Sequence, residues 1–293
     1  MGLEINDIYI CCSAKTKDSE EVLLNSIKDK LGHRLIDFLE YDGEGEFVVL
    51  VIGGDGTLNY FLNNTKYLNK AKVLYIPRGT ANDFAKSLYG QSQKLEITNE
   101  HILDIINNAL LVDVPVMQCN EQKFINVATA GAPAMVTDSG NSLIKEYGGR
   151  LSYFISAIEK VMTSYLYDIK VCHEDNCRDY KCYGFFVSQG LYAGGGVRTS
   201  LSQVPLFGRE FSLTFKEDES VLGSISSVIK IQNMNSREEL LKDESGINFS
   251  MHEKVIISSS KSIDVKLDGE EYKSKELEFS KSKDQIKFYI FNS

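Results

Sequence analysis

The chain has 293 residues, of which 43% are hydrophobic and 25% are charged, a composition typical of a globular protein large enough for two domains. Its formal net charge of −9 argues against nucleic acid as the main partner, because such binding depends on lysine and arginine neutralising phosphates. No window approaches the roughly 20 uninterrupted apolar residues that span a bilayer, and the first residues lack the layout of a signal peptide, so we expect a cytoplasmic protein.

The first quarter of the chain alternates between strand and helix patterns. Asp18, with Glu21 three residues later, resembles a capping box and predicts a helix to about Leu31, and a second helix is expected after Thr57. This β-α-β-β-α-β order predicts an α/β domain with a parallel sheet. The expected strands are residues 5–11, 34–40, 46–52 and 72–76.

A glycine-rich loop follows the buried strand at 46–52. Glycines let a ligand approach the backbone, and a helix start directs N–H groups at an anion, so the loop has the form of a phosphate site. Asp55 would repel phosphate unless a cation lay between them, which indicates Mg²⁺ bridging to a nucleotide. The alternative is a tight turn in which Asp55 makes only local hydrogen bonds. The loop residues are Gly53, Gly54, Asp55, Gly56, Thr57, Leu58 and Asn59.

A second loop, residues 77–85, follows the strand at 72–76. Gly79 and Thr80 can add backbone donors and a hydroxyl to the same site, since ligands of parallel sheets bind beyond the carboxyl ends of the strands. Asn82 or Asp83 is expected to cap the helix that follows. For Asn82 and Asp83, ordinary helix capping is as good an explanation as a role in a ligand site.

From Val112 onward the pattern changes to short strands, interrupted by one helix at about 151–165, which predicts an antiparallel β domain. We therefore expect two domains. The first is an α/β domain of residues 1–112 with the tail near 284–293, and the second is a β-sandwich domain of residues 113–283.

Two turns of the second domain carry charged residues. The glycine-rich turn 190–198 contains Arg198, which either faces a phosphate or carboxylate or belongs to a plain β connection. Asp268, Gly269, Glu270 and Glu271 have the form of a hairpin turn, for which no function is needed.

The six cysteines imply no disulfide framework. Adjacent Cys11 and Cys12 in an apolar strand are interpreted as buried reduced thiols. Cys172, Cys177 and Cys182, together with His173, form no common zinc pattern and are expected on two strands of a hairpin that turns at 174–179.

The two glycine loops, 53–59 and 79–85, resemble those of the diacylglycerol kinase catalytic-domain family, and in particular its small soluble bacterial lipid kinases. Further stretches agree with that family in the same order along nearly the whole chain. They are Val112-Asp113-Val114, Phe124-Ile125-Asn126-Val127-Ala128, Tyr192-Ala193-Gly194-Gly195-Gly196-Val197-Arg198 and Leu267-Asp268-Gly269-Glu270.

The resemblance implies a nucleotide-binding α/β domain related to NAD kinases and phosphofructokinases, then a β-sandwich domain. It implies transfer of phosphate from ATP, with Mg²⁺, to a lipid hydroxyl such as that of diacylglycerol. Residues 53–59 with Gly79, Thr80 and Asn82 would hold ATP. Asp55, Asp83 and Asp113 would position Mg²⁺ through water.

Glu270 would be the general base, although related eukaryotic lipid kinases give this role to the loop aspartate, so the choice between Asp55 and Glu270 stays open. The lipid substrate implies peripheral contact with a membrane surface, and the sequence leaves a homodimer open. A catalytically silent lipid- or nucleotide-binding relative and an NAD kinase are the alternatives.

Two departures from the family pattern stand out. Cys12-Ser13-Ala14-Lys15-Thr16 replaces the usual Asn-Pro-x-Ser-Gly after the first strand. In residues 206–212, Arg209 stands where bacterial members carry an aspartate that binds a structural Mg²⁺. A guanidinium cannot ligate Mg²⁺, so we expect this second metal site to be absent, with the arginine charge in place of the ion.

Overall fold

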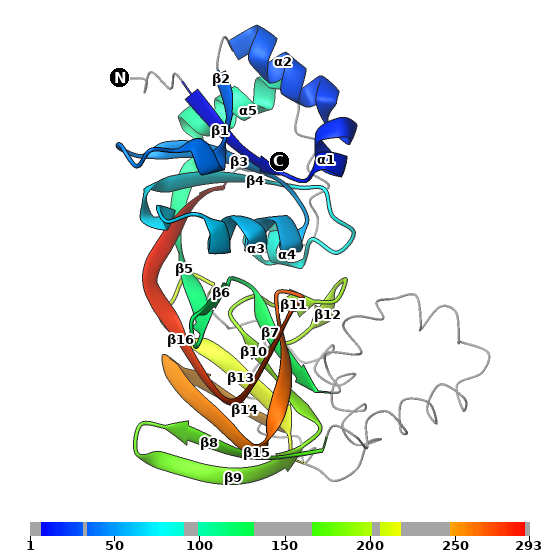
Figure 1. The fold of residues 1–293 in the computed structure, drawn as a ribbon, viewed down its shortest axis with the longest axis vertical. Coiled ribbons are helices and arrows are strands. Elements are labelled where there is room, and N and C mark those ends of the chain that lie inside the picture. Colours follow the sequence, from blue (N-terminus) through cyan, green and yellow to red (C-terminus); the bar gives the residue numbers. More distant parts are fainter. Residues whose placement is uncertain are drawn as a thin grey trace, which may run out of the picture. The chain divides into compact units, whose positions relative to one another are not determined.

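The structure is a computed structural model that describes six stretches of the chain (Figure 1). They are residues 7–31, 34–90, 99–131, 166–200, 206–217 and 247–290. The chain divides into two compact units, residues 1–116 with 282–293 and residues 117–281. No helix of the described stretches is both long and apolar enough to cross a membrane.

The first unit is built on a parallel sheet with the strand order β16-β4-β3-β1-β2. Its strands are β1 (Asp7–Cys12), β2 (Arg34–Asp37), β3 (Phe47–Gly53), β4 (Ala71–Pro77) and the end of β16 (Glu270–Ile290). Its helices are α1 (Ala14–Ser19), α2 (Glu21–Leu31), α3 (Asp55–Asn64), α4 (Asp83–Tyr89) and α5 (Asn99–Asn108), with 3-10 turns at Phe38–Glu40 and Leu68–Lys70. The predicted α/β domain with parallel pairing is confirmed.

β3 lies at the centre of this unit, with helices over both of its faces (Figure 1). All seven of its residues are buried, as expected for an apolar run in a parallel sheet. On one face, Leu50 and Ile52 pack with Leu24 of α2 and with Ile102 and Ile105 of α5. α3 and α4 cover the other face. The packing holds the loops at the end of β3 on a rigid base.

The first helical region differs from the prediction. The single helix expected from Asp18 is two helices, α1 and α2, separated at Glu20. Ser13 caps α1 in place of Asp18, because its Oγ accepts a hydrogen bond from the backbone N–H of Thr16 at 3.2 Å. The altered first loop therefore serves as a helix cap.

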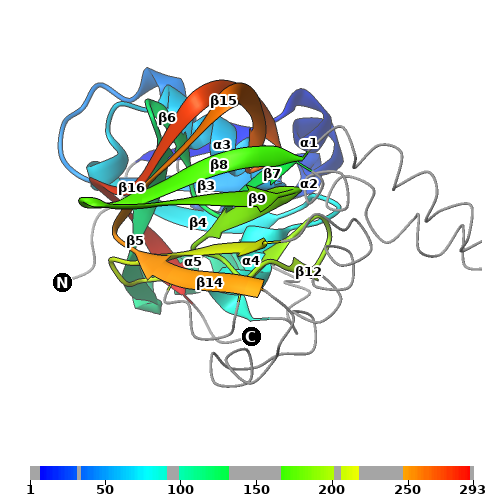
Figure 2. The same ribbon diagram turned by 90° about the horizontal axis from the view of Figure 1, so that it is seen from below.

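The second unit is formed by antiparallel strands in the order β14-β13-β10-β7-β15-β16, with β8 and β9 added beside β15. Figure 2 shows β8 and β9 side by side. The strands of this unit are the end of β5 (Leu110–Cys119), β6 (Gln122–Phe124), β7 (Val127–Gly131), β8 (Tyr167–His173), β9 (Asn176–Cys182), β10 (Gly184–Ser188), β13 (Phe211–Lys216), β14 (Ile247–His252), β15 (Lys254–Leu267) and the start of β16. β11 (Tyr192–Ala193) and β12 (Val197–Arg198) form a separate pair. Buried side chains of the larger group of strands, including Phe124, Phe185 and Phe211, make one core. The predicted antiparallel β domain is confirmed.

β15 and β16 are longer than the short strands predicted after Val112. Four of those predicted strands were residues 255–258, 263–267, 277–280 and 286–291. The first two belong to β15, whose register shifts between Ser258 and Ile263. Residues 277–280 and 286–291 likewise belong to the 21-residue strand β16, as far as Ile290. The helix expected at 151–165 lies outside the described residues.

The β8–β9 hairpin is confirmed, with its turn at Glu174 and Asp175. Cys172 and Cys177 are direct cross-strand partners and form a disulfide, so the expectation that the chain holds no disulfide is wrong for this pair. The register sets their Cα atoms 4.1 Å apart, and spacing along the sequence does not reveal register. Cys11, Cys12, Cys119 and Cys182 are free, and of these only Cys12 is not buried.

Candidate active site

The two glycine loops leave the same edge of the first unit's sheet. β3 and β4 are neighbouring parallel strands, and Gly53 at the end of β3 is paired with Pro77 at the end of β4. The backbone N–H of Arg78 also donates to the carbonyl of Gly53 at 2.9 Å. The structure therefore brings together the two sequence motifs that predicted one site.

The loops pack backbone against backbone. A Cβ atom added to Gly79 would lie 2.5 Å from the Cα of Gly54 and 2.8 Å from Oδ1 of Asn82. One added to Gly53 would overlap the side chain of Thr57. Gly56 differs, because a Cβ there would meet nothing within 4 Å. Gly53 and Gly79 are thus required by close packing, whereas Gly56 leaves open space beside the start of α3.

Asp55 joins the two loops through its carboxylate. Its Oδ2 accepts a hydrogen bond from the backbone N–H of Asp83 and its Oδ1 one from that of Phe84, both at 3.0 Å. These are the first N–H groups of α4, so a side chain from α3 caps this helix. Burial raises the pKa of Asp55, while the two backbone donors act in the opposite direction.

Asn82 or Asp83 was expected to cap α4, and the structure places Asn82 at the N-cap position without a capping hydrogen bond from its side chain. Its backbone is left-handed, with φ of 50°, and its amide instead bridges Gly79, accepting from the N–H at 2.9 Å and donating to the carbonyl at 2.7 Å. Asp83 is the first residue of α4, and its buried carboxylate pairs with Lys86 at 2.9 Å. The sequence did not reveal that Asp55 caps α4, because Asp55 lies 28 residues before Asp83 in the chain.

The remaining predicted nucleotide-binding residues differ in exposure. Thr80 is exposed. The helix expected after Thr57 begins at Asp55 instead, so Thr57 lies in the first turn of α3. Leu58 and Asn59 are buried. Of these four side chains, that of Thr80 is the one most open to a ligand.

The acidic residues expected to position a metal are only partly gathered. Asp55 and Asp83 are neighbours, since the charge of Asp83 contributes to the raised pKa of Asp55. Asp113 is an exposed residue of β5 whose charge acts on Lys287. Among the described residues, no group of three or more histidine, cysteine, aspartate or glutamate side chains is placed to hold a metal ion directly.

In the second unit, the predicted hairpin turn joins β15 to β16. Asp268 and Gly269 have φ of 50° and 99°, as a tight turn requires, and Glu270 opens β16 opposite Leu267. The side chain of Glu270 is exposed, and within the described stretches it forms no hydrogen bond or ion pair. Its carboxylate is therefore free to meet a substrate.

The two basic positions singled out in the sequence have different settings. Arg198 is half-buried in β12, which pairs with β11. Arg209 is exposed, and the cation that contacts its loop is Lys281, whose Nζ donates to the carbonyl of Gly208 at 2.7 Å. Burial lowers the pKa of Lys281 to about 8.

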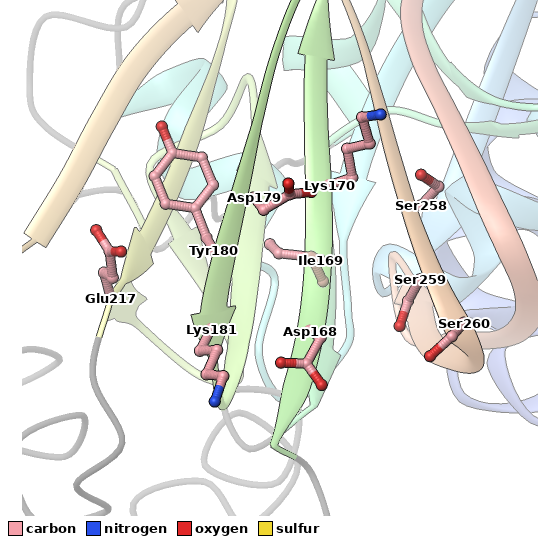
Figure 3. A pocket seen from close by; sticks show the side chains of 10 residues that line it. All are labelled: Asp168, Ile169, Lys170, Asp179, Tyr180, Lys181, Glu217, Ser258, Ser259 and Ser260. Atoms are coloured by element: carbon pink, nitrogen blue, oxygen red, sulfur yellow. The ribbon is translucent and has the colours of Figure 1, made fainter.

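A cavity of about 700 Å³ lies elsewhere in the second unit, along β8, β9 and β15 (Figure 3). Asp168 is the cross-strand partner of Lys181, and Lys170 that of Asp179, so opposite charges balance along its wall. None of the predicted site residues lines it. It is a separate feature of this unit.

Alanine at Gly79 is expected to lower the free energy of unfolding by about 1–3 kcal/mol, because its Cβ would press on the backbone of Gly54. Alanine at Gly56 is the matched control, with open space around it and a helical position that favours alanine, so stability should stay the same or rise by up to about 1 kcal/mol. Urea unfolding of the two variants checks this. Equal losses would contradict the close approach of the loops.

The fold and the paired glycine loops define a class of protein shared with solved kinase structures. A diacylglycerol kinase from Bacillus anthracis is similar over 98% of this chain and 97% of its own, with a TM-score of 0.68 at 15% identity. An NAD kinase from Archaeoglobus fulgidus, solved in complex with ATP, is similar over 97% of this chain and 92% of its own, with a TM-score of 0.53 at 14% identity. These likenesses establish the fold.

Sequence comparison then gives the family. Residues 16–119 match the family described as "Diacylglycerol kinase catalytic domain". Proteins called diacylglycerol kinase from Staphylococcus epidermidis and Staphylococcus aureus are 27% and 26% identical over 225 and 241 residues, which are 76% and 81% of this chain. The chain spans 65% and 70% of the length of these relatives. The predicted resemblance is confirmed over residues 16–119, which match the diacylglycerol kinase catalytic-domain family.

Proposed function

We propose that the protein is a lipid kinase that transfers the γ-phosphoryl group of ATP to the hydroxyl of a diacylglycerol-like lipid. One observation carries the proposal: the carboxylate of Asp55 joins two glycine loops at the carboxyl edge of the sheet, where such folds bind ligands. The family match of the same residues and the relatives called diacylglycerol kinase support this substrate class over NAD. ATP is supported by the NAD kinase of related fold, whose structure contains it.

The nucleotide phosphates are assigned to the first unit. The backbone at Gly56, where no neighbour limits approach, and the N-terminus of α3 provide donors and a positive helix end. The exposed hydroxyl of Thr80 adds a donor from the second loop. Gly53, Gly54, Gly79 and Asn82 act indirectly, because they hold the loops in shape.

The residues present fit a hydrated Mg²⁺ ion. Asp55 uses two of its roughly four acceptor positions for α4, so the others remain for a metal or its waters. Mg²⁺ commonly keeps several waters and takes one or two carboxylates together with substrate phosphates, so a direct cluster of three acids is not needed. Asp83 and Asp113 are assigned the outer positions. The ion would neutralise charge on the transferring phosphoryl group.

Glu270 is assigned the role of general base. As the lipid oxygen bonds to the γ-phosphorus and the bond from that phosphorus to the β-γ bridging oxygen breaks, the hydroxyl proton passes to the Glu270 carboxylate and ADP leaves. Its exposure and lack of a partner in the described stretches leave the carboxylate ready for that proton. Because the substrate is a membrane lipid, the enzyme would act in peripheral contact with a membrane surface.

The test is incubation of the purified protein with labelled ATP, Mg²⁺ and mixed micelles of diacylglycerol, beside a total lipid extract. We expect label in phosphatidic acid, or in another phosphorylated lipid of the extract identified by mass spectrometry. Omission of Mg²⁺ should abolish the product. Label in NADP after addition of NAD, with none in lipid, would instead identify an NAD kinase, and no transfer to any acceptor would indicate a silent binding protein.

A further inference from the structure

The carboxylate of Asp268 is bound by three consecutive backbone N–H groups. Ile125 donates to its Oδ2 at 2.6 Å, and Asn126 and Val127 both donate to its Oδ1 at 2.9 Å. In addition, the backbone N–H of Asp268 donates to the carbonyl of Val127 at 3.0 Å. Four hydrogen bonds therefore join the β15–β16 turn to the segment between β6 and β7.

A hairpin turn of this kind does not need such bonds. Asp268 and Gly269 already adopt the left-handed conformations that favour a two-residue turn, and Leu267 and Glu270 close it as a cross-strand pair. Three donors converging on one carboxylate form a charge-assisted contact that is stronger than neutral hydrogen bonds. The contact fixes where the turn lies relative to β7, and Glu270 is two residues from Asp268.

The same segment also holds the start of the glycine-rich turn. The carbonyl of Asn126 accepts from the N–H groups of Gln189 and Gly190, both at 3.1 Å, and Nδ2 of Asn126 donates to the carbonyl of Tyr192 at 2.8 Å. Asn126 is buried, with 3% exposure. Residues 125–127 thus connect the Glu270 turn to the residues that precede β12.

We propose that Asp268 is a positioning residue for phosphoryl transfer, because its three backbone donors place the turn that presents Glu270. This inference rests on the proposed function and deepens it. The sequence gives no link between the motif around Asn126 and the acidic turn at residues 268–271. In the structure, hydrogen bonds to the Asp268 carboxylate join them. Asp268 itself does not contact the reacting atoms in this role.

The test is Asp268→Asn, assayed well below its unfolding temperature. An asparagine keeps one acceptor oxygen, but its amide would turn a donor toward backbone N–H groups. We expect kcat to fall about 10- to 100-fold with the KM for ATP unchanged, because small displacements of a reacting group have effects of this size. Hydrogen exchange at the amides of residues 125–127 should become faster.

Asp264→Asn is the matched control, since Asp264 lies on β15, the strand that leads into the Asp268 turn, and forms an exposed ion pair with Lys273 at 2.7 Å. It should retain kcat and exchange rates. If Asp268→Asn fails to fold, Gly269→Ala moves the same turn with the Asp268 carboxylate intact, because alanine is strained at φ of 99° while nothing lies within 4 Å of its Cβ. It should lower kcat without affecting the KM for ATP.

Glu270→Gln is run in the same assay to separate the two proposals. Loss of activity in Glu270→Gln, with full kcat in Asp268→Asn or in its substitute Gly269→Ala, would overturn the positioning role and leave the proposed function standing. Full activity in Glu270→Gln would overturn the base assignment, and with it the reason for Asp268 to matter. Wild-type protein without kinase activity on any lipid would refute the proposed function itself.

Discussion

Replacement of Asp55 by asparagine is expected to lower kcat for lipid phosphorylation by about 10³-fold or more while the protein remains folded. The Asp55 carboxylate would hold Mg²⁺ directly or through the waters of the ion, and an amide carries no charge for that role. The fold should survive because two effects on stability oppose each other. In the variant, the NH₂ group of asparagine faces one of the two backbone N–H donors, and this mismatch costs about 1–3 kcal/mol. The substitution also removes the charge of the carboxylate, and this removal favours the folded state.

The direction of the Asp55 pKa supports this balance. Burial raises that pKa, which means that the folded state favours the uncharged form more than the unfolded chain does. Ionised Asp55 therefore lowers stability above its usual pKa, and this cost disappears as the pH falls through the folded pKa. A neutral asparagine avoids the same cost at neutral pH.

Phosphorylation of diacylglycerol and thermal unfolding of the Asp55→Asn variant test this. Asp37→Asn is the control, because the Asp37 carboxylate also accepts a backbone N–H, that of Leu39 at 3.0 Å, but lies outside both glycine loops. Normal turnover in Asp55→Asn would show that Asp55 is a structural cap of α4 and nothing more. Global unfolding of that variant would show that the clamp between the loops dominates its role.

The sequence predicts the framework of the first unit well because its signals are local. β3 is an uninterrupted apolar run, and the glycine loops directly follow strands, so parallel pairing alone brings them to one edge. The partners of Asp55 could not be predicted, because they are backbone groups 28 and 29 residues later, in a loop whose own Asn82 or Asp83 was the expected cap. The side chain of Asn82 instead closes the second loop around Gly79.

The length of β16 could not be predicted from the sequence. Residues 281–285 are polar, which suggested a break between two strands, but β16 continues through them. An Asp-Gly pair is sufficient for a hairpin turn, so the sequence offered no reason to expect a further role for Asp268. The three backbone N–H groups of residues 125–127 that bind its carboxylate were therefore not predicted. The disulfide between Cys172 and Cys177 likewise depends on register, which spacing does not fix.

Replacement of Glu270 by glutamine is expected to lower kcat about 10²- to 10⁴-fold with the KM for ATP unchanged, because a glutamine cannot accept the proton of the lipid hydroxyl. The exposed side chain packs against little, so the unfolding temperature should not change. Steady-state kinetics with ATP and diacylglycerol micelles measure both parameters.

Glu271→Gln is a closely matched control. Glu271 is the next residue of β16 and is also exposed. Among the residues that the structure describes, its side chain makes only a long ion pair to Lys266 at 4.0 Å, so its loss should change neither kcat nor stability noticeably. The comparison with Asp55→Asn then assigns the base. If Glu270→Gln keeps its rate while Asp55→Asn loses it, the proton passes to Asp55. If both variants lose kcat and only Asp55→Asn also requires more Mg²⁺, Asp55 serves the metal and Glu270 takes the proton.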